Sequence, residues 1–280
     1  MKRLGLAHYE NVLPLLKSVP FNALFAIVVA QQKVHGTIFA DSEIEPTVCL
    51  VVHKYGMSFL VGEHANSRFN SSLADFLLNG PQNNSTAKWM LTYPEPWENT
   101  LAELLGDRLR KKGDALDPPA RQVPGGKCVI QTRRVNFRFR EDLFVNHTIL
   151  PKGFNLKNVD EIIYPQVTGS VVPYNFWDTC QDFLDNAIGF SLVSDQGVVS
   201  TSFASFIDGA QLELGVETDP AFRGRSYALY PCTSLINYCL AAGYEPLWAC
   251  SEDNVGSFKL ALKLGFTPET YHPYYVIPVS

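Results

Sequence analysis

The chain has 280 residues, 46% of them hydrophobic and 18% charged, so it can bury a core in one large domain or two moderate ones. Its formal net charge of −5 provides no positive field for nucleic acid or anionic lipid, and we expect neither as a partner. The most apolar stretch, 23–30, is far shorter than the roughly 20 residues of a membrane span, and the first residues do not resemble a signal peptide. We therefore expect a soluble, cytoplasmic protein, either a monomer or a homodimer.

The six cysteines show neither a C-x-x-C pair nor a histidine at metal-ligand spacing. We interpret them as buried, reduced thiols, because free cysteine behaves as a small hydrophobic residue. The sequence thus predicts no metal site and no disulfide framework.

The first half of the chain alternates predicted strands with predicted helices. After a helix-rich opening, strands are predicted at 35–40, 47–53, 57–61, 88–93 and 127–140, and helices at 67–78 and 96–105. The charged, proline-containing stretch 108–126 is predicted to be a surface loop. Arginines alternate with Val135, Phe137 and Phe139 on the last strand, which is compatible either with a nucleic-acid platform or with a half-buried strand. The acidic net charge favours the half-buried strand.

A domain boundary is predicted near 145–157, where polar residues, Pro151 and Gly153 interrupt the apolar pattern. We expect domains at 1–145 and 146–280. In the second half, helices are predicted at 158–167, at 176–186, from Gly224 onward and at 254–264, and strands at 190–193, 199–206, 211–218, 246–250 and 274–279. This alternation indicates a mixed α/β (α+β) fold with a mixed sheet.

The most informative segment runs from Gln211 to Ala228. A predicted strand leads through Asp219-Pro220 into the hexapeptide Arg223-Gly224-Arg225-Ser226-Tyr227-Ala228, where a helix is expected to begin. The first turn of a helix has main-chain N–H groups without intrahelical partners and the positive end of the helix dipole, so it attracts phosphate. The small residues Gly224, Ser226 and Ala228 would let a pyrophosphate approach the backbone.

The hexapeptide resembles the acyl-CoA signature of the GNAT acetyltransferases, [Q/R]-x-x-G-x-[G/A], and Asn254 and Ser257 resemble a second element that holds the CoA arm in that family. Asn254 is also a good N-cap, and Gly265 a good residue just past a helix end. The sequence departs from the pattern at Ser226, where the family has glycine. Pro231 predicts a kink or a late start of the helix.

The resemblance is closest to the GNAT branch typified by the zwittermicin A resistance protein, through residues such as Phe176-Trp177-Asp178 and Gly189-Phe190. It covers nearly all of the second half. The order of elements in the first half is similar to the GNAT plan but lacks the signature, so we interpret that domain as a degenerate GNAT-like copy. An unrelated α+β cap is the alternative.

The resemblance implies an acetyl-CoA-dependent N-acetyltransferase that acts on a small-molecule amine in one ternary complex. Val216 and Thr218 are then the candidates for main-chain contacts to the pantetheine, and Glu213 or Glu217 for the general base. The two glutamates lie four residues apart, on one face of a strand. For each, a solvent-facing carboxylate without a catalytic role is the alternative.

The usual acid of the family is a tyrosine at the position that Ala261 occupies here. Tyr271 is our candidate in its place, with His272, Tyr274, Tyr275, Ser251 and water as further options. Ser226 and Ala261 leave a second function open, a catalytically silent acyl-CoA-binding or regulatory module. The sequence does not identify the acceptor.

Overall fold

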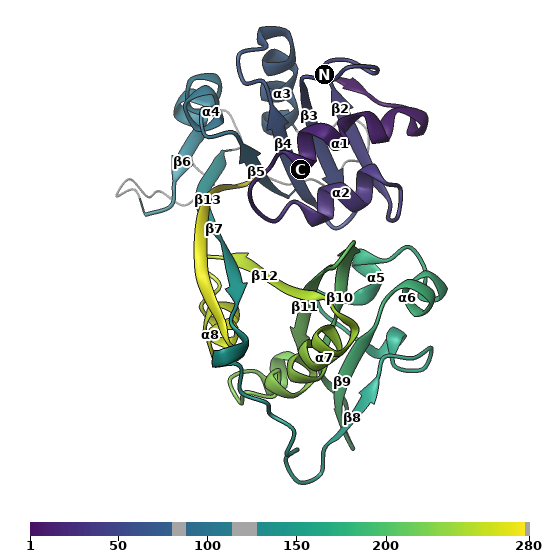
Figure 1. The fold of residues 1–280 in the computed structure, drawn as a ribbon. Coiled ribbons are helices and arrows are strands. Elements are labelled where there is room, and N and C mark those ends of the chain that lie inside the picture. Colours follow the sequence, from purple (N-terminus) through teal and green to yellow (C-terminus); the bar gives the residue numbers. More distant parts are fainter. Residues whose placement is uncertain (80–87, 114–127, 278–280) are drawn as a thin grey trace. The chain divides into compact units, whose positions relative to one another are not determined.

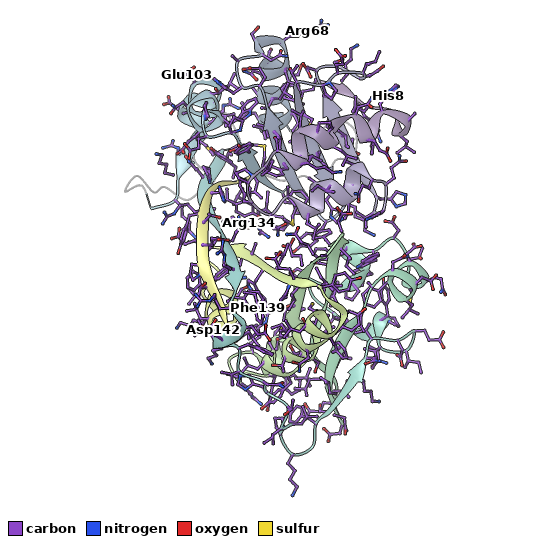
Figure 2. The ribbon with its side chains drawn as sticks, in the orientation of Figure 1. His8, Arg68, Glu103, Arg134, Phe139 and Asp142 are labelled. Atoms are coloured by element: carbon purple, nitrogen blue, oxygen red, sulfur yellow. The ribbon has the colours of Figure 1, made fainter. Side chains whose placement is uncertain are left out.

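The computed structural model describes residues 1–79, 88–113 and 128–277, which form two compact units (Figure 1). Unit 1 comprises Met1–Arg134 together with Tyr271–Ser280, and unit 2 comprises Val135–Thr270. The chain leaves unit 1 along β7 (Val129–Phe139) and returns along β13 (Phe266–Val276). Arg134 and Phe139, labelled on β7 in Figure 2, therefore belong to different units. This division differs from the expected 1–145 and 146–280 in its boundary and in the place of the last residues.

Unit 1 is a mixed sheet with helices on both faces. Its helices are a 3-10 turn at Leu6–Val12, α1 (Leu13–Lys17), α2 (Leu24–Ala30), α3 (Ser67–Asn79) and α4 (Trp97–Leu105). Its strands are β1 (Lys2–Arg3), β2 (Gly36–Ala40), β3 (Val48–His53), β4 (Met57–Gly62), β5 (Trp89–Tyr93) and β6 (Leu109–Lys111), with parts of β7 and β13. The order is β1-β2-β3-β4-β5-β13-β7, and β6 pairs with β7.

Strand β3 shows why this sheet needs helices on both faces, because every one of its residues is buried. Val48, Leu50 and Val52 pack into one apolar cluster with residues of α3 and α4. Successive side chains alternate between the faces of a strand, so the residues between them face the opposite layer. There, α2 contacts β3, and Phe25 of α2 stacks on Phe59 of β4 with 6.0 Å between ring centroids.

Unit 2 has a similar layered construction. Its helices are α5 (Pro173–Phe176), α6 (Cys180–Asn186), α7 (Leu229–Ala242) and α8 (Val255–Lys263). Its strands are β8 (Asn155–Asn158), β9 (Gly189–Ser194), β10 (Gly197–Asp208), β11 (Gln211–Thr218) and β12 (Glu245–Ser251), and the order is β13-β7-β12-β11-β10-β9-β8. Leu212 and Leu214 of β11 share an apolar cluster with α7 and α8. On the other face, Phe176 of α5 packs against Phe203 of β10.

The two units repeat one order of elements. In unit 1, β2, β3 and β4 are antiparallel, and β5 pairs parallel to β4 after the intervening helix α3. In unit 2, β9, β10 and β11 are antiparallel, and β12 pairs parallel to β11 after α7. The copies differ in one respect: β4 and β5 pair over five residues, from Met57↔Trp89 to Val61↔Tyr93, whereas β11 and β12 pair over three, from Gln211↔Glu245 to Glu213↔Leu247.

Most expected elements are present, and the mixed α/β class is confirmed, but four expectations are corrected. The predicted helix 158–167 is wrong: Asp160 accepts hydrogen bonds from the N–H groups of Ile162 and Ile163, and only a short 3-10 turn, Tyr164–Gln166, follows. Within the predicted helix 176–186, only Phe176, which ends α5, and residues 180–186, which form α6, are helical. The helix expected from Gly224 begins at Leu229, and the last strand begins at Phe266 rather than near residue 274.

Part of the expected surface loop 108–126 lies outside the described residues, and 109–111 within it form β6. Within the ranges that the structure describes, no helix is long and apolar enough to cross a membrane, and no cluster of side chains could hold a metal ion.

Candidate functional site

The site is built around the far end of β11. After Glu213, β11 loses its pairing with β12 but stays paired with β10 as far as Thr218. A gap in strand pairing at this point leaves one edge of β11 available to a ligand. Because β12 pairs with β11 over only three residues, the rest of β11 has an unpaired side although it lies in the middle of the strand order.

Serines of β10 indicate which main-chain groups face that open edge. The carbonyl oxygens of Glu213, Gly215 and Glu217 accept hydrogen bonds from the hydroxyls of Ser205, Ser202 and Ser200 at 2.9, 3.1 and 3.2 Å. These odd-numbered carbonyls therefore point toward β10, and because backbone directions alternate along a strand, Val216 and Thr218 direct theirs the other way. The carbonyl of Thr218 is taken by the Nε of Arg223 at 2.9 Å.

The chain between β11 and α7 forms a turn rich in available N–H groups. Pro220–Phe222 makes a 3-10 turn that the Asp219 side chain caps. Among the described residues, the five N–H groups from Gly224 to Ala228 have no intramolecular acceptor. Gly224 has φ 77° and Ser226 has φ 62°, so left-handed residues alternate along this loop. Successive N–H groups in such a conformation form a concave anion-binding nest.

Ser226 stands where the family signature has glycine, and it already adopts the left-handed conformation that glycine favours. Such a conformation costs an ordinary residue about 1–2 kcal/mol. Its hydroxyl accepts a hydrogen bond from the Nζ of Lys263, on α8, at 3.2 Å. Although Ser226 departs from the signature, its backbone keeps the left-handed conformation that glycine would favour at this position.

Helix α7 starts late, as Pro231 predicted. Pro231 is the third residue of the helix, inside its first turn, where the missing N–H breaks no intrahelical bond. The N–H groups of Leu229 and Tyr230 bond to the carbonyls of Ser226 and Tyr227 at 3.1 and 3.3 Å. The groups that remain available to an anion thus belong to the preceding loop rather than to the helix itself.

The start of α8 forms the opposite wall. Asn254 is its N-cap, and the side-chain Oδ1 accepts from the N–H of Ser257 at 3.1 Å, as predicted. The hydroxyl of Ser257 accepts from the indole N–H of Trp248 at 3.2 Å. Trp248 packs in the apolar cluster of unit 2. It is 2% exposed, but it also fixes the hydroxyl of Ser257.

These walls enclose a pocket of about 560 Å³ within unit 2. Of the ten residues predicted to bind the cofactor, nine line it: Val216, Thr218, Arg223, Gly224, Ser226, Tyr227, Ala228, Asn254 and Ser257. The tenth, Arg225, is not among the lining residues, and its guanidinium lies 6.0 Å from the ring centroid of Phe222. Glu217, predicted as an alternative base, lines the pocket as well.

Sequence reasoning missed four lining residues that matter. Lys259 and Lys263 lie one turn apart on α8 and provide positive charge beside the N–H loop. Ser170 and Val171 contribute a wall from a loop before α5. The two lysines could have been identified from their spacing after Asn254. Ser170 and Val171 precede Glu217 by 47 and 46 residues, and no local pattern indicates them.

Glu213 does not line the pocket. It is 5% exposed, the one carboxylate among the buried side chains that the structure describes, so a solvent-facing position is wrong for it. It lies on the face of β11 that carries Gly215 and Glu217, and the Phe203 ring fills the space over Gly215, where a Cβ would meet it at 2.6 Å. Phe203 thus separates the two glutamates that sequence reasoning grouped together.

Tyr271, the candidate acid, belongs to unit 1 and is 43% exposed, with the Arg133 guanidinium 5.0 Å from its ring centroid. Tyr275 is fully buried in the apolar cluster of unit 1, and burial raises the pKa of its hydroxyl, so it is no longer an option as the acid. Ala261 is fully buried on α8.

A family model described as GNAT acetyltransferase matches residues 20–275. The chain is 26% identical over 254 residues to YdfB of Bacillus subtilis strain 168, which is described as an uncharacterized N-acetyltransferase; the alignment covers 90% of this chain and 89% of YdfB.

Solved structures show the same fold. A GCN5-related N-acetyltransferase-like protein from Streptococcus suis 89/1591 has a TM-score of 0.69 and 20% identity, covering 98% of this chain and 100% of that one. A tandem GNAT protein from the clavulanic acid biosynthesis pathway has a TM-score of 0.57 and 11% identity, covering 98% of this chain and 96% of that one.

Proposed function

This chain belongs to the GNAT acetyltransferase family, and we propose that it transfers the acetyl group of acetyl-CoA to an amine of a small molecule while both are bound. One observation carries the choice of acetyl-CoA as donor. The unpaired edge of β11 leads directly to five available N–H groups at Gly224–Ala228, an arrangement that suits an amide-containing arm ending in a pyrophosphate. Lys259 and Lys263 add positive charge to this pocket.

The reaction that this site would support is direct acyl transfer. The amine nitrogen forms a bond to the thioester carbonyl carbon, the carbon–sulfur bond breaks, and CoA leaves as a thiolate that takes up a proton. The ammonium form of the acceptor first loses one proton to a base. The nitrogen loses a second proton when the adduct collapses to the amide, which balances the proton that the thiolate takes up. The protein would accelerate the reaction mainly by holding the two reactants close together and correctly oriented, which converts a bimolecular step into an effectively unimolecular one.

We propose Glu213 as the base. Glu213 lies early on β11, the strand that would hold the thioester arm, and its carboxylate is largely shielded from solvent at 5% exposure. Glu217, the other candidate, is less suited to take a proton, because both of its oxygens already accept hydrogen bonds. Tyr271 remains our proposal for the acid, since Ala261 leaves no hydroxyl at the usual position on α8.

A silent acyl-CoA-binding module is the second candidate, and Ala261 is the observation that favours it. Thermal-shift titration with acetyl-CoA, followed by thiol release against a panel of amines that includes aminated antibiotics, separates the candidates. Stabilisation with turnover of one amine supports the enzyme. Stabilisation without turnover across the panel favours the silent module, and no stabilisation would overturn both.

Glu213→Gln tests the base, because the amide keeps the shape of the side chain but is not basic. We expect turnover to fall by ~10²–10⁴-fold with little change in acetyl-CoA affinity. Glu245→Gln is the matched control, since Glu245 starts β12 and bonds to Gln211 outside the pocket. Near-parental turnover in Glu213→Gln would remove Glu213 from this role.

We also propose that unit 1 is a degenerate copy that binds no acetyl-CoA. Its β4 and β5 pair over all five residues to Tyr93, so the edge that is open in unit 2 is closed there. Calorimetry should give one acetyl-CoA per chain, and a stoichiometry of two would contradict this proposal.

The narrower resemblance to the zwittermicin A resistance branch stays a prediction. The aminated antibiotics in the amine panel test it.

A further inference from the structure

The carboxylate of Glu217 joins two segments that are far apart in the chain. Its Oε2 accepts hydrogen bonds from the N–H groups of Ser170 and Val171 at 2.9 and 3.0 Å and from the Ser170 hydroxyl at 3.3 Å. Its Oε1 accepts from the guanidinium of Arg223 at 2.9 Å. The Glu217 side chain is 9% exposed, so this hydrogen-bonded carboxylate is largely shielded from solvent.

Gly169 allows the loop to approach this closely. It has φ 131°, a conformation that other residues rarely adopt, and a Cβ at this position would lie 2.6 Å from the carboxyl group of Glu217. The loop 169–171 can therefore present two consecutive N–H groups to one oxygen only because residue 169 has no side chain.

Arg223 completes a closed set of contacts. Besides Glu217, its guanidinium bonds to the carbonyl of Thr218, so the first residue of the signature hexapeptide is held against the end of β11. Gly224, where the run of available N–H groups begins, follows it directly. The position of the anion-binding loop is thus linked through Arg223 to the same carboxylate that holds the loop 169–171.

The residues joined by this carboxylate all line the pocket: Ser170, Val171, Glu217 and Arg223. We propose that Glu217 is a positioning residue for acetyl-CoA, which acts by holding the wall 169–171 and the phosphate loop at fixed places around the pocket. The proposal rests on the proposed function and assigns Glu217 a role other than the base. Four donors are directed at this carboxylate, so both of its oxygens are engaged as acceptors within the pocket wall.

Glu217→Gln is informative because an amide cannot replace the carboxylate. Its single oxygen can satisfy either the N–H groups of the loop or the Arg223 guanidinium, and its NH₂ then faces donors on the other side. Gly169→Ala perturbs the same wall without changing any charge, because the added Cβ pushes the loop away from Glu217. If either variant fails to fold, the other still tests the proposal.

The experiment is calorimetric titration of the full-length wild type and both variants with acetyl-CoA, with Glu245→Gln as the control. We expect the dissociation constant to rise about tenfold, or about 1.4 kcal/mol, in Glu217→Gln and in Gly169→Ala, and to stay within twofold in Glu245→Gln. Hydrogen exchange at Ser170 and Val171 should become faster in both variants. With an amine from the panel, KM for acetyl-CoA should rise while kcat stays within about threefold.

The outcomes separate this proposal from the proposed function. A wild type that does not bind acetyl-CoA would overturn both. A wild type that binds, with both variants binding equally well, would overturn the positioning role alone. A fall of kcat by 10²-fold at unchanged acetyl-CoA affinity in Glu217→Gln would instead assign the base to Glu217.

Discussion

The indole N–H of Trp248 donates a hydrogen bond to the hydroxyl of Ser257 across 3.2 Å, from the middle of β12 to the first turn of α8. Ser257 also bonds through its N–H to Asn254, so its hydroxyl is held in one orientation beside the pocket. Trp248→Phe keeps the ring that packs on Phe266 but removes this donor. We expect acetyl-CoA affinity to fall roughly fivefold, the equivalent of about 1 kcal/mol for one hydrogen bond.

Trp97→Phe is the matched control for Trp248→Phe, because the buried indole of Trp97 donates to the carbonyl of Gly62 in unit 1. Calorimetry with acetyl-CoA should leave this control at the wild-type affinity. Equal affinity in both variants would show that the Trp248 hydrogen bond only stabilises the fold.

Gly224→Val should weaken acetyl-CoA binding at least tenfold, about 1.4 kcal/mol. The φ of 77° is unfavourable for valine, and a side chain there would lie beside the N–H groups that face the pocket. Gly243 caps the C-terminal end of α7 and has the same φ of 77° and the same open surroundings as Gly224. Gly243→Val should therefore lose similar thermal stability but bind acetyl-CoA as the wild type does, and equal weakening in both would mean that strain alone is responsible.

Lys259→Gln and Lys263→Gln should each weaken binding of CoA about fivefold, near 1 kcal/mol for a partly solvated charge contact with phosphate. The effect should shrink at high salt, because these side chains are exposed and screening reduces their interaction. Titrations with CoA and with dephospho-CoA at two salt concentrations measure it. Lys157→Gln, on the edge strand β8, serves as the control, and a loss of affinity there would indicate a general charge effect.

His272 should make unit 1 less stable in acid. Its ring stacks on Phe21 with 3.6 Å between centroids, and burial lowers its pKa below the usual 6.5, against the opposing effect of Glu95. The unfolded chain then binds the proton more readily than the folded chain, so stability is complete above pH 6.5 and falls as pH drops below it. Thermal unfolding between pH 5 and 7.5 should show a shallower acid loss for His272→Phe than for the wild type. Identical pH profiles would contradict the prediction.

The sequence predicted elements best where strong local signals bound them. Strand β11 was predicted with its full bounds. The end of α3 was predicted within one residue, because the run Asn79-Gly80-Pro81 begins at its last residue. The failed helix at 158–167 carries apolar residues at helical spacing, and Val159, Ile163 and Val167 are indeed buried. Pro165 and the Asp160 side chain, which bonds to nearby N–H groups, favour turns over a helix there.

The residues of the candidate site likewise fall into those that local sequence signals predict and those that only the folded structure reveals. Asn254, Ser257 and the hexapeptide at Arg223 were predictable because each occupies a local turn or cap whose geometry depends on neighbours in sequence. The bonds of Glu217 to Ser170 and Val171 span 47 and 46 residues, so only the folded chain reveals them. Long-range contacts of this kind make Glu217, for which a solvent-facing position was the alternative, a largely shielded acceptor of hydrogen bonds.

The course of β13 has a consequence for how the protein is made. Its last residues, Tyr274–Val276, pair with Leu91, Met90 and Trp89 of β5, and Tyr275 lies in the core of unit 1. Domains generally fold in the order in which a ribosome releases them. Here unit 1 lacks the strand between β5 and β7 until residues 274–276 emerge, so unit 2 can complete its sheet first. A chain that stalls before those residues would carry an incomplete core in unit 1.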